Sequence, residues 1–205
     1  MPYFKNDKIN LLFIHIPKTG GSSLDFYFSE KYNIPLNTKS LYTNPNEVLS
    51  TGIVSQHLTF SLIKANAHQF DVDFNGITII SIVRNPYERL ISGFFYLKWI
   101  DKNTTCDDVY LVLKEKSKYF PPQYLFLVDD NNKINENIII LKTETLDTDM
   151  KKLGYTDFNL RMNTTNMNVN YYSYLNATAI MMINMVYEND FKYFNYPIIV
   201  FNKEI

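Results

Sequence analysis

Residues 11–24, LLFIHIPKTGGSSL, join an apolar run to a short loop of small residues that carries one lysine. The run from Leu11 to Ile16 is typical of a strand buried on both faces in a parallel sheet. Where such a strand leads through a tight loop into a helix, backbone N–H groups and the positive end of the helix dipole converge on one point, and Lys18 adds a full charge there. The pattern predicts a phosphate-binding loop at the edge where open α/β sheets bind ligands.

The order of residues in this loop differs from that of the Walker loop in nucleotide kinases. Lys18 precedes Gly20 and Gly21, and no Gly-Lys-Ser/Thr follows. The alternative interpretation is a tight glycine turn beside a solvated lysine. It is the weaker of the two, because the loop, the lysine and a helix start coincide.

Two further apolar runs, residues 77–83 and 137–141, predict buried strands. Strands that alternate with helices indicate an α/β fold with three layers around a central parallel sheet. Residues 53–55 and 196–201 are weaker strand candidates. Helices are expected near residues 23–32, 59–67, 85–99, 107–117, 145–153 and 174–190.

Two of these helices have specific start signals. Ser22 or Ser23 is expected to cap the helix that follows the lysine loop. The helix after the second strand has Asn85 at its cap, Pro86 at its first position and Glu88 at its third. Its core-facing stripe is expected to consist of Leu90, Ile91, Phe94, Phe95 and Leu97.

Composition limits the class of protein. The chain has 205 residues, a net charge of −1, and 46% hydrophobic against 20% charged residues. This fits a single domain over residues 1–205 and does not indicate a nucleic-acid partner. With Cys106 as the one cysteine, no internal disulfide or cysteine-rich metal site is expected. No run reaches the ~18 apolar residues of a membrane span, and the N-terminus lacks the core of a signal peptide, so we expect a cytoplasmic protein.

A second motif, Ser81–Gly93, follows the second strand directly. Arg84 leaves the carboxyl end of that strand, and its planar fork suits a phosphate. Ser92 lies about two turns into the next helix and can offer a hydroxyl to the same anion. The alternative is that Arg84 pairs with a carboxylate and that Ser92 is a small packing residue.

Together the segments PKTGGSS and VRNPYERLISG resemble the sulfotransferases that use 3′-phosphoadenosine 5′-phosphosulfate (PAPS). The similarity is greatest to the carbohydrate branch, which includes the heparan sulfate 2-O-sulfotransferases. It covers most of the chain. Further segments fall in the order of that family: residues 55–60, 122–125, 140–146, 163–165 and 187–191.

The resemblance implies a P-loop-like sulfotransferase architecture and a role for each matching position. The 5′-phosphosulfate would be held by Lys18, Thr19, Gly20, Gly21, Ser22 and Ser23. Arg84 and Ser92 would hold the 3′-phosphate. Lys18 would also face the oxygen that bridges phosphorus and sulfur, where charge develops as the sulfuryl group departs.

His57 is the candidate general base, because an imidazole near its unperturbed pKa of ~6.5 can accept a hydroxyl proton at neutral pH. A loop or capping residue is the alternative interpretation of His57. His15 lies inside an apolar strand and is expected to be a satisfied core histidine, and His68 is expected at the surface. Glu88 and Glu144 fall near helix starts, where capping is the simpler explanation.

The sequence therefore predicts an enzyme that moves a sulfuryl group from PAPS to a hydroxyl acceptor, with a carbohydrate as the expected acceptor and no metal. One alternative is a small-molecule or nucleotide kinase, which would need a magnesium-holding Ser/Thr after the lysine and a partnered acidic group. A second is a catalytically inactive module that binds a nucleotide or a glycan.

Overall fold

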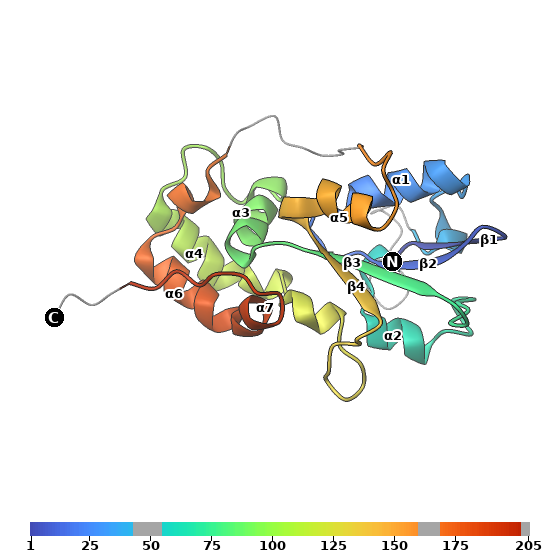
Figure 1. Cartoon of the computed structure of the whole chain (residues 1–205). Helices are drawn as coiled ribbons and strands as arrows, with labels where there is room; N and C mark the ends of the chain where they lie inside the picture. The colour runs from blue at the N-terminus through green and yellow to red at the C-terminus, as the bar shows by residue number, and fades with distance from the viewer. Residues whose placement is uncertain (43–54, 160–168, 202–205) are drawn as a thin grey trace. The chain divides into compact units, whose positions relative to one another are not determined.

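The computed structural model describes residues 1–42, 55–159 and 169–201. The chain divides into two compact units. The first consists of Met1–Val83 with Leu125–Thr164, and the second of Arg84–Tyr124 with Thr165–Ile205. The helices and strands of each unit are drawn in Figure 1.

A four-stranded sheet forms the centre of the first unit, in the order β1-β2-β3-β4. The pairs β2–β3 and β3–β4 are parallel, with Leu12 opposite Ile79 and Ile80 opposite Ile139. The α/β fold with a central, mostly parallel sheet is thus confirmed. The strands span Tyr3–Asn6 (β1), Ile9–Ile14 (β2), Thr78–Val83 (β3) and Ile138–Lys142 (β4).

Strand β1 was not expected from the sequence. It pairs with β2 in antiparallel register, from Tyr3 opposite Leu12 to Asn6 opposite Ile9. The turn is closed by the Asn6 side chain, whose Oδ1 accepts the N–H groups of Lys8 at 2.8 Å and Ile9 at 3.2 Å. Such a turn depends on one asparagine rather than on a hydrophobic pattern, and a four-residue strand is too short to show a period of two.

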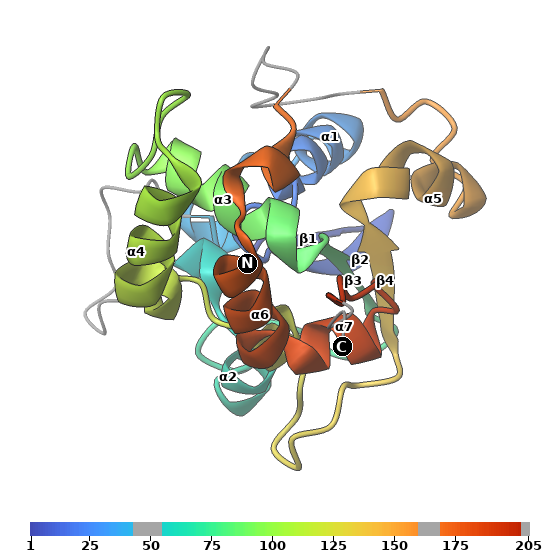
Figure 2. The same cartoon turned by 90° about the vertical axis from the view of Figure 1, so that its left-hand side faces the viewer.

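Helices cover both faces of this sheet, which gives the first unit three layers (Figures 1 and 2). Helices α1 (Gly21–Tyr32) and α5 (Leu146–Lys152) lie on one face, and α2 (Phe60–Ala65) lies on the other. The core under α1 and α5 is made of Phe4, Leu11, Phe13, Leu24, Tyr27, Phe28, Ile80, Ile82, Leu141, Leu146, Met150 and Phe158.

The second unit is helical. Its described helices are α3 (Pro86–Tyr96), α4 (Cys106–Lys116), α6 (Ala177–Val186) and α7 (Glu188–Tyr193). The expected start of α3 is confirmed, because the Asn85 side chain accepts the Tyr87 N–H at 3.0 Å. Leu97 lies beyond the end of α3 and is exposed, so it does not belong to the core stripe. The core contains Tyr87, Leu90, Ile91, Phe94, Val109, Leu113, Phe120, Ile180, Ile183 and Phe191.

Three expectations about element ends were wrong. The cap of α1 is Gly20, and neither Ser22 nor Ser23 caps it. Helix α4 begins at Cys106, one residue before the expected start, and Thr105 caps it. The last helix is divided at Tyr187 into α6 and α7.

The tail at residues 196–201 is not a strand, contrary to expectation. Side chains provide its backbone partners instead: Ile199 donates its N–H to the Tyr87 hydroxyl at 3.0 Å, and its carbonyl accepts from Asn184 Nδ2 at 2.9 Å. The other weak strand candidate, residues 53–55, lies largely outside the described residues, and Ser55 begins a 3₁₀ turn. No helix in the described part of the chain is both long and apolar enough to cross a membrane.

A substitution at Gly93 in α3 tests how closely this helix packs against Phe120 in the second unit. Alanine normally stabilises a helix interior relative to glycine by about 1 kcal/mol. A Cβ at Gly93, however, would lie 2.4 Å from Cζ of the buried Phe120 ring. We therefore expect Gly93→Ala to lower the free energy of unfolding by about 1–3 kcal/mol in urea denaturation. In a Phe120→Leu background the same substitution should cost nothing, and an equal cost in both backgrounds would contradict this explanation.

Candidate functional site

The lysine loop of the first unit has an unusual backbone. Lys18 has φ 69° and Gly20 has φ 84°, so two of three consecutive residues are in the left-handed region. Glycine adopts this conformation freely, but for lysine it is strained. Strained backbone of this kind is concentrated at functional sites, and turns that include left-handed residues direct successive N–H groups into anion-binding concavities.

The start of α1 is a second feature that suits an anion. Gly20 caps the helix without a side chain, and the first turn contains no acidic residue. No carboxylate of the first turn therefore offsets the positive end of this 12-residue helix. Ser22 is half-buried and Ser23 is buried in this first turn.

The Thr19 side chain is used inside the loop. Thr19 is fully buried, and its hydroxyl donates to the Ile16 carbonyl at 2.9 Å. The Thr19 carbonyl lies 2.6 Å from the hydroxyl of Thr143, which also lies 3.1 Å from the Val83 carbonyl. Thr143, the first residue after β4, thus ties the lysine loop to the end of β3. It was not among the residues predicted for the site, although its position at the end of a strand is a signal of that kind.

The His15 side chain packs against the first residue of α1, directly after the loop. Its side chain is buried, Nδ1 lies 2.8 Å from the carboxylate of the fully buried Asp25, and its ring stacks on Phe13. A Cβ at Gly21 would lie 2.5 Å from Cδ2 and Nε2 of this ring. Only glycine therefore fits at the first position of α1, and the expectation of a core histidine at position 15 is confirmed.

The tautomer of His57 follows from its neighbours. Its Nδ1 lies 2.9 Å from the His15 carbonyl, and because a carbonyl can only accept, Nδ1 must carry the hydrogen. The basic lone pair is then on Nε2, which lies 3.3 Å from the Gln56 amide nitrogen, a donor. A neutral imidazole held in this form is able to take up a proton at Nε2.

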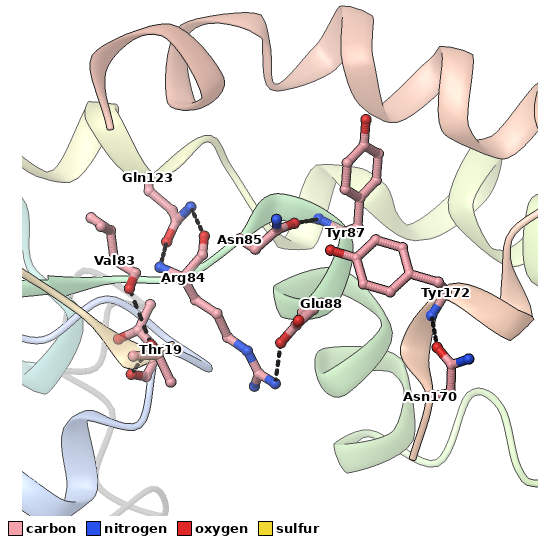
Figure 3. A network of polar contacts seen from close by, with 10 residues as sticks. Thr19, Val83, Arg84, Asn85, Tyr87, Glu88, Gln123, Asn170 and Tyr172 are labelled. Carbon is pink, nitrogen blue, oxygen red and sulfur yellow. Dashed lines mark hydrogen bonds and ion pairs between the residues drawn. The ribbon is translucent and has the colours of Figure 1, made fainter. Parts of the chain in front are cut away.

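In the second unit, one nitrogen of the Arg84 guanidinium is paired with a carboxylate. Its Nη2 lies 3.1 Å from Glu88 Oε2 (Figure 3), and its guanidinium carbon lies 5.0 Å from the centre of the Tyr171 ring. This pairing with a carboxylate is the alternative that the sequence left open for Arg84, whereas for Glu88 capping had been the expectation. Arg84 Nε is buried and has no hydrogen-bond partner among the described residues. A buried N–H donor without a partner is costly, and a bound anion would satisfy it.

Ser92 is half-buried on α3. It follows Glu88 by four residues, so both side chains lie on one face of the helix. Because Glu88 is the partner of Arg84, the Ser92 hydroxyl belongs to the same face as the arginine contact.

Metal ligands are not gathered in the described parts of the chain: within residues 1–42, 55–159 and 169–201, no three His, Cys, Asp or Glu side chains could hold a metal ion together. Residues 163–165, one of the segments that fall in the order of the family, lie outside the described residues.

Comparison with known proteins gives one match. The model of a family described as "Sulfotransferase family" matches residues 1–197. Searches of curated proteins and of solved structures gave no match.

Thr143→Val removes the hydroxyl between the loop and β3 while keeping the shape of the side chain. We expect it to lower the free energy of unfolding by about 1 kcal/mol, because the contacted carbonyls lose their shared donor. Thr145→Val is the matched control, since its hydroxyl donates to Asp149 at an exposed site where water can replace it. Equal losses in the two variants, measured by chemical denaturation, would show that the link is unimportant.

Proposed function

Because the chain belongs to the sulfotransferase family, we propose that it transfers a sulfuryl group from PAPS to a hydroxyl of an acceptor, with carbohydrates as the acceptor class. One observation carries the choice of donor. The lysine loop and Arg84 each offer N–H donors suited to an anion, and the donor has two separate anionic ends, the 5′-phosphosulfate and the 3′-phosphate.

The lysine loop is proposed to bind the 5′-phosphosulfate. Two left-handed residues, Lys18 and Gly20, and the start of α1, which has no side-chain cap, support this assignment. The participating residues would be Lys18, Thr19, Gly20, Gly21, Ser22 and Ser23. For Thr19 the contribution would come from its backbone N–H, since its hydroxyl donates to the Ile16 carbonyl.

Arg84 and Ser92 are proposed to bind the 3′-phosphate. Support comes from the buried Arg84 Nε, which has no hydrogen-bond partner among the described residues. The salt bridge to Glu88 involves only Nη2 of the guanidinium. A phosphate dianion next to a guanidinium makes charge-assisted hydrogen bonds, which are about twice as strong as neutral ones.

In the proposed reaction, His57 Nε2 takes the proton of the acceptor hydroxyl as that oxygen forms a bond to sulfur. The bond between sulfur and the bridging oxygen breaks, and Lys18 stabilises the negative charge left on that oxygen. The products are a sulfate ester and adenosine 3′,5′-bisphosphate. Positioning, one base and one cation account for the rate enhancement without a metal ion.

The nucleotide preference tests the donor. Adenosine 3′,5′-bisphosphate should raise the melting temperature more than AMP, ADP or ATP does, because only it fills both anion sites; ligand at 100 times its Kd stabilises by about 2.7 kcal/mol. Equal or greater stabilisation by ATP with magnesium would favour the kinase instead.

Arg84→Ala should weaken the binding of adenosine 3′,5′-bisphosphate by roughly 2–4 kcal/mol and leave AMP binding nearly unchanged.

The roles of His57 and Lys18 are tested as a pair in single-turnover assays with labelled PAPS, a panel of glycan, lipid and phenol acceptors, and excess chelator. His57→Ala should lose 10²–10⁴-fold in rate and still bind nucleotide like the parent. Lys18→Ala should lose both affinity and rate, because Lys18 contacts the donor before and during transfer.

Three results would contradict parts of this scheme. Full turnover by His57→Ala would place the base elsewhere. Complete and reversible loss of activity in chelator would require a metal. Tight nucleotide binding without turnover on any acceptor would favour an inactive binding module.

A further inference from the structure

Gln123 holds the backbone of Arg84 at two points. Its Oε1 accepts the Arg84 N–H at 2.9 Å, and its Nε2 donates to the Arg84 carbonyl at 2.8 Å (Figure 3). A neighbouring antiparallel strand makes the same pair of bonds to a single residue. Gln123 is fully buried, so water does not compete for these bonds, and together they determine where the Arg84 side chain begins.

Arg84 needs such a partner because the ladder of hydrogen bonds in the sheet stops before it. The last registered pair of β3 and β4 is Val83 with Lys142. Beyond it, the N–H and carbonyl of Arg84 would lack backbone partners, which is costly away from water. The Gln123 amide provides both.

Asp190 in α7 fixes Gln123 in turn. Its Oδ2 accepts the backbone N–H of Gln123 at 2.8 Å and Gln123 Nε2 at 3.3 Å, and its Oδ1 accepts the Tyr124 N–H at 2.9 Å. Both groups that face Gln123 Nε2, the Asp190 carboxylate and the Arg84 carbonyl, are acceptors. The amide therefore has one possible orientation, with its NH₂ toward them and its oxygen toward the Arg84 N–H.

The buried Asp190 carboxylate is held by these donors. The pKa of Asp190 is raised, because the effect of burial exceeds the opposite effects of the Gln123 and Tyr124 N–H groups and of the Arg89 charge. Arg89 is itself buried on α3 and donates to the Pro121 carbonyl at 2.9 Å. A buried carboxylate with several donors is a rigid anchor, because any movement would leave a charge without partners.

We propose that Gln123, anchored by Asp190, is a positioning residue that keeps Arg84 where its guanidinium can meet the 3′-phosphate of the donor. The inference rests on the proposed function, which supplies the ligand of Arg84. The side chain leaves a clamped backbone, with Glu88 on one arm and the Tyr171 ring nearby. A guanidinium held in this way loses little freedom when the anion binds.

The test measures how strongly the protein prefers a nucleotide with a 3′-phosphate. The dissociation constants of adenosine 3′,5′-bisphosphate and of AMP are determined by calorimetry, and their ratio is compared between variants. Gln123→Met keeps nearly the same volume but offers no N–H donor and no amide oxygen. The ratio is the dissociation constant of AMP divided by that of adenosine 3′,5′-bisphosphate. Gln123→Met should reduce this ratio roughly tenfold or more, because a small displacement of the Arg84 guanidinium weakens its contact with the 3′-phosphate.

Tyr87→Phe is the matched control. It also removes a side-chain partner of a backbone N–H in the second unit, that of Ile199. The hydrogen bonds of Tyr87 go to Asn85, Asn184 and Ile199 rather than to Arg84. A purely structural role for Gln123 predicts that both variants lose stability and keep the ratio of the parent. An unchanged ratio in Gln123→Met therefore overturns the inference.

Combination with Arg84→Ala separates the possible failures. If Gln123 acts through Arg84, adding Gln123→Met to Arg84→Ala changes the ratio no further, whereas an additional loss overturns the inference. If the ratio in Arg84→Ala alone equals that of the parent, the proposed 3′-phosphate contact is wrong.

Should Gln123→Met fail to fold, as judged by circular dichroism, Asp190→Asn replaces it in the test, because asparagine keeps the shape of the anchoring side chain. That variant should also reduce the ratio, and an unchanged ratio overturns the inference.

Discussion

The parallel register of β2, β3 and β4 is the constraint on which the candidate site depends. These strands end at Ile14, Val83 and Lys142, and the carboxyl ends of neighbouring parallel strands fall on one edge of a sheet. The loop with Lys18 follows the first of these ends, and Thr143 follows the last. Without this register, the Thr143 hydroxyl could not contact both the loop and the end of β3.

Where the backbone ladder stops, polar side chains replace it. Thr143 does so between the loop and β3, and Gln123 does so for Arg84. In the tail, which forms no strand, Tyr87 and Asn184 bind the N–H and carbonyl of Ile199. In each case a backbone group that would otherwise lack a partner is satisfied by one hydroxyl or amide. Such contacts specify a local geometry more narrowly than burial does, because a hydrogen bond has a direction.

The groups proposed to act on the donor and acceptor are held in position before any ligand binds. The strained backbone at Lys18 is one example, and the single tautomer of His57 enforced by the His15 carbonyl is another. Arg84 is restrained by Glu88 and by the Gln123 amide. Preorganisation of this kind lowers the cost of bringing charges together in the transition state.

Local order in the sequence was sufficient to predict the strand, loop and helix around Lys18 and the Asn-Pro start of α3, because these depend on neighbouring residues and on hydrophobic periodicity. Lys18 and Arg84 were found as candidate residues in the same way. Their supports were not, since Gln123 is 39 residues from Arg84 and Thr143 is 124 residues from Thr19. Which side chain satisfies a backbone group left over at the end of a strand has no local pattern, because the partner is chosen by the packing of distant segments. The sequence alone predicted the three parallel strands and the starts of the helices near Lys18 and Asn85; only the tertiary structure decided which side chains hold Thr19, Val83 and Arg84, because those side chains come from distant segments.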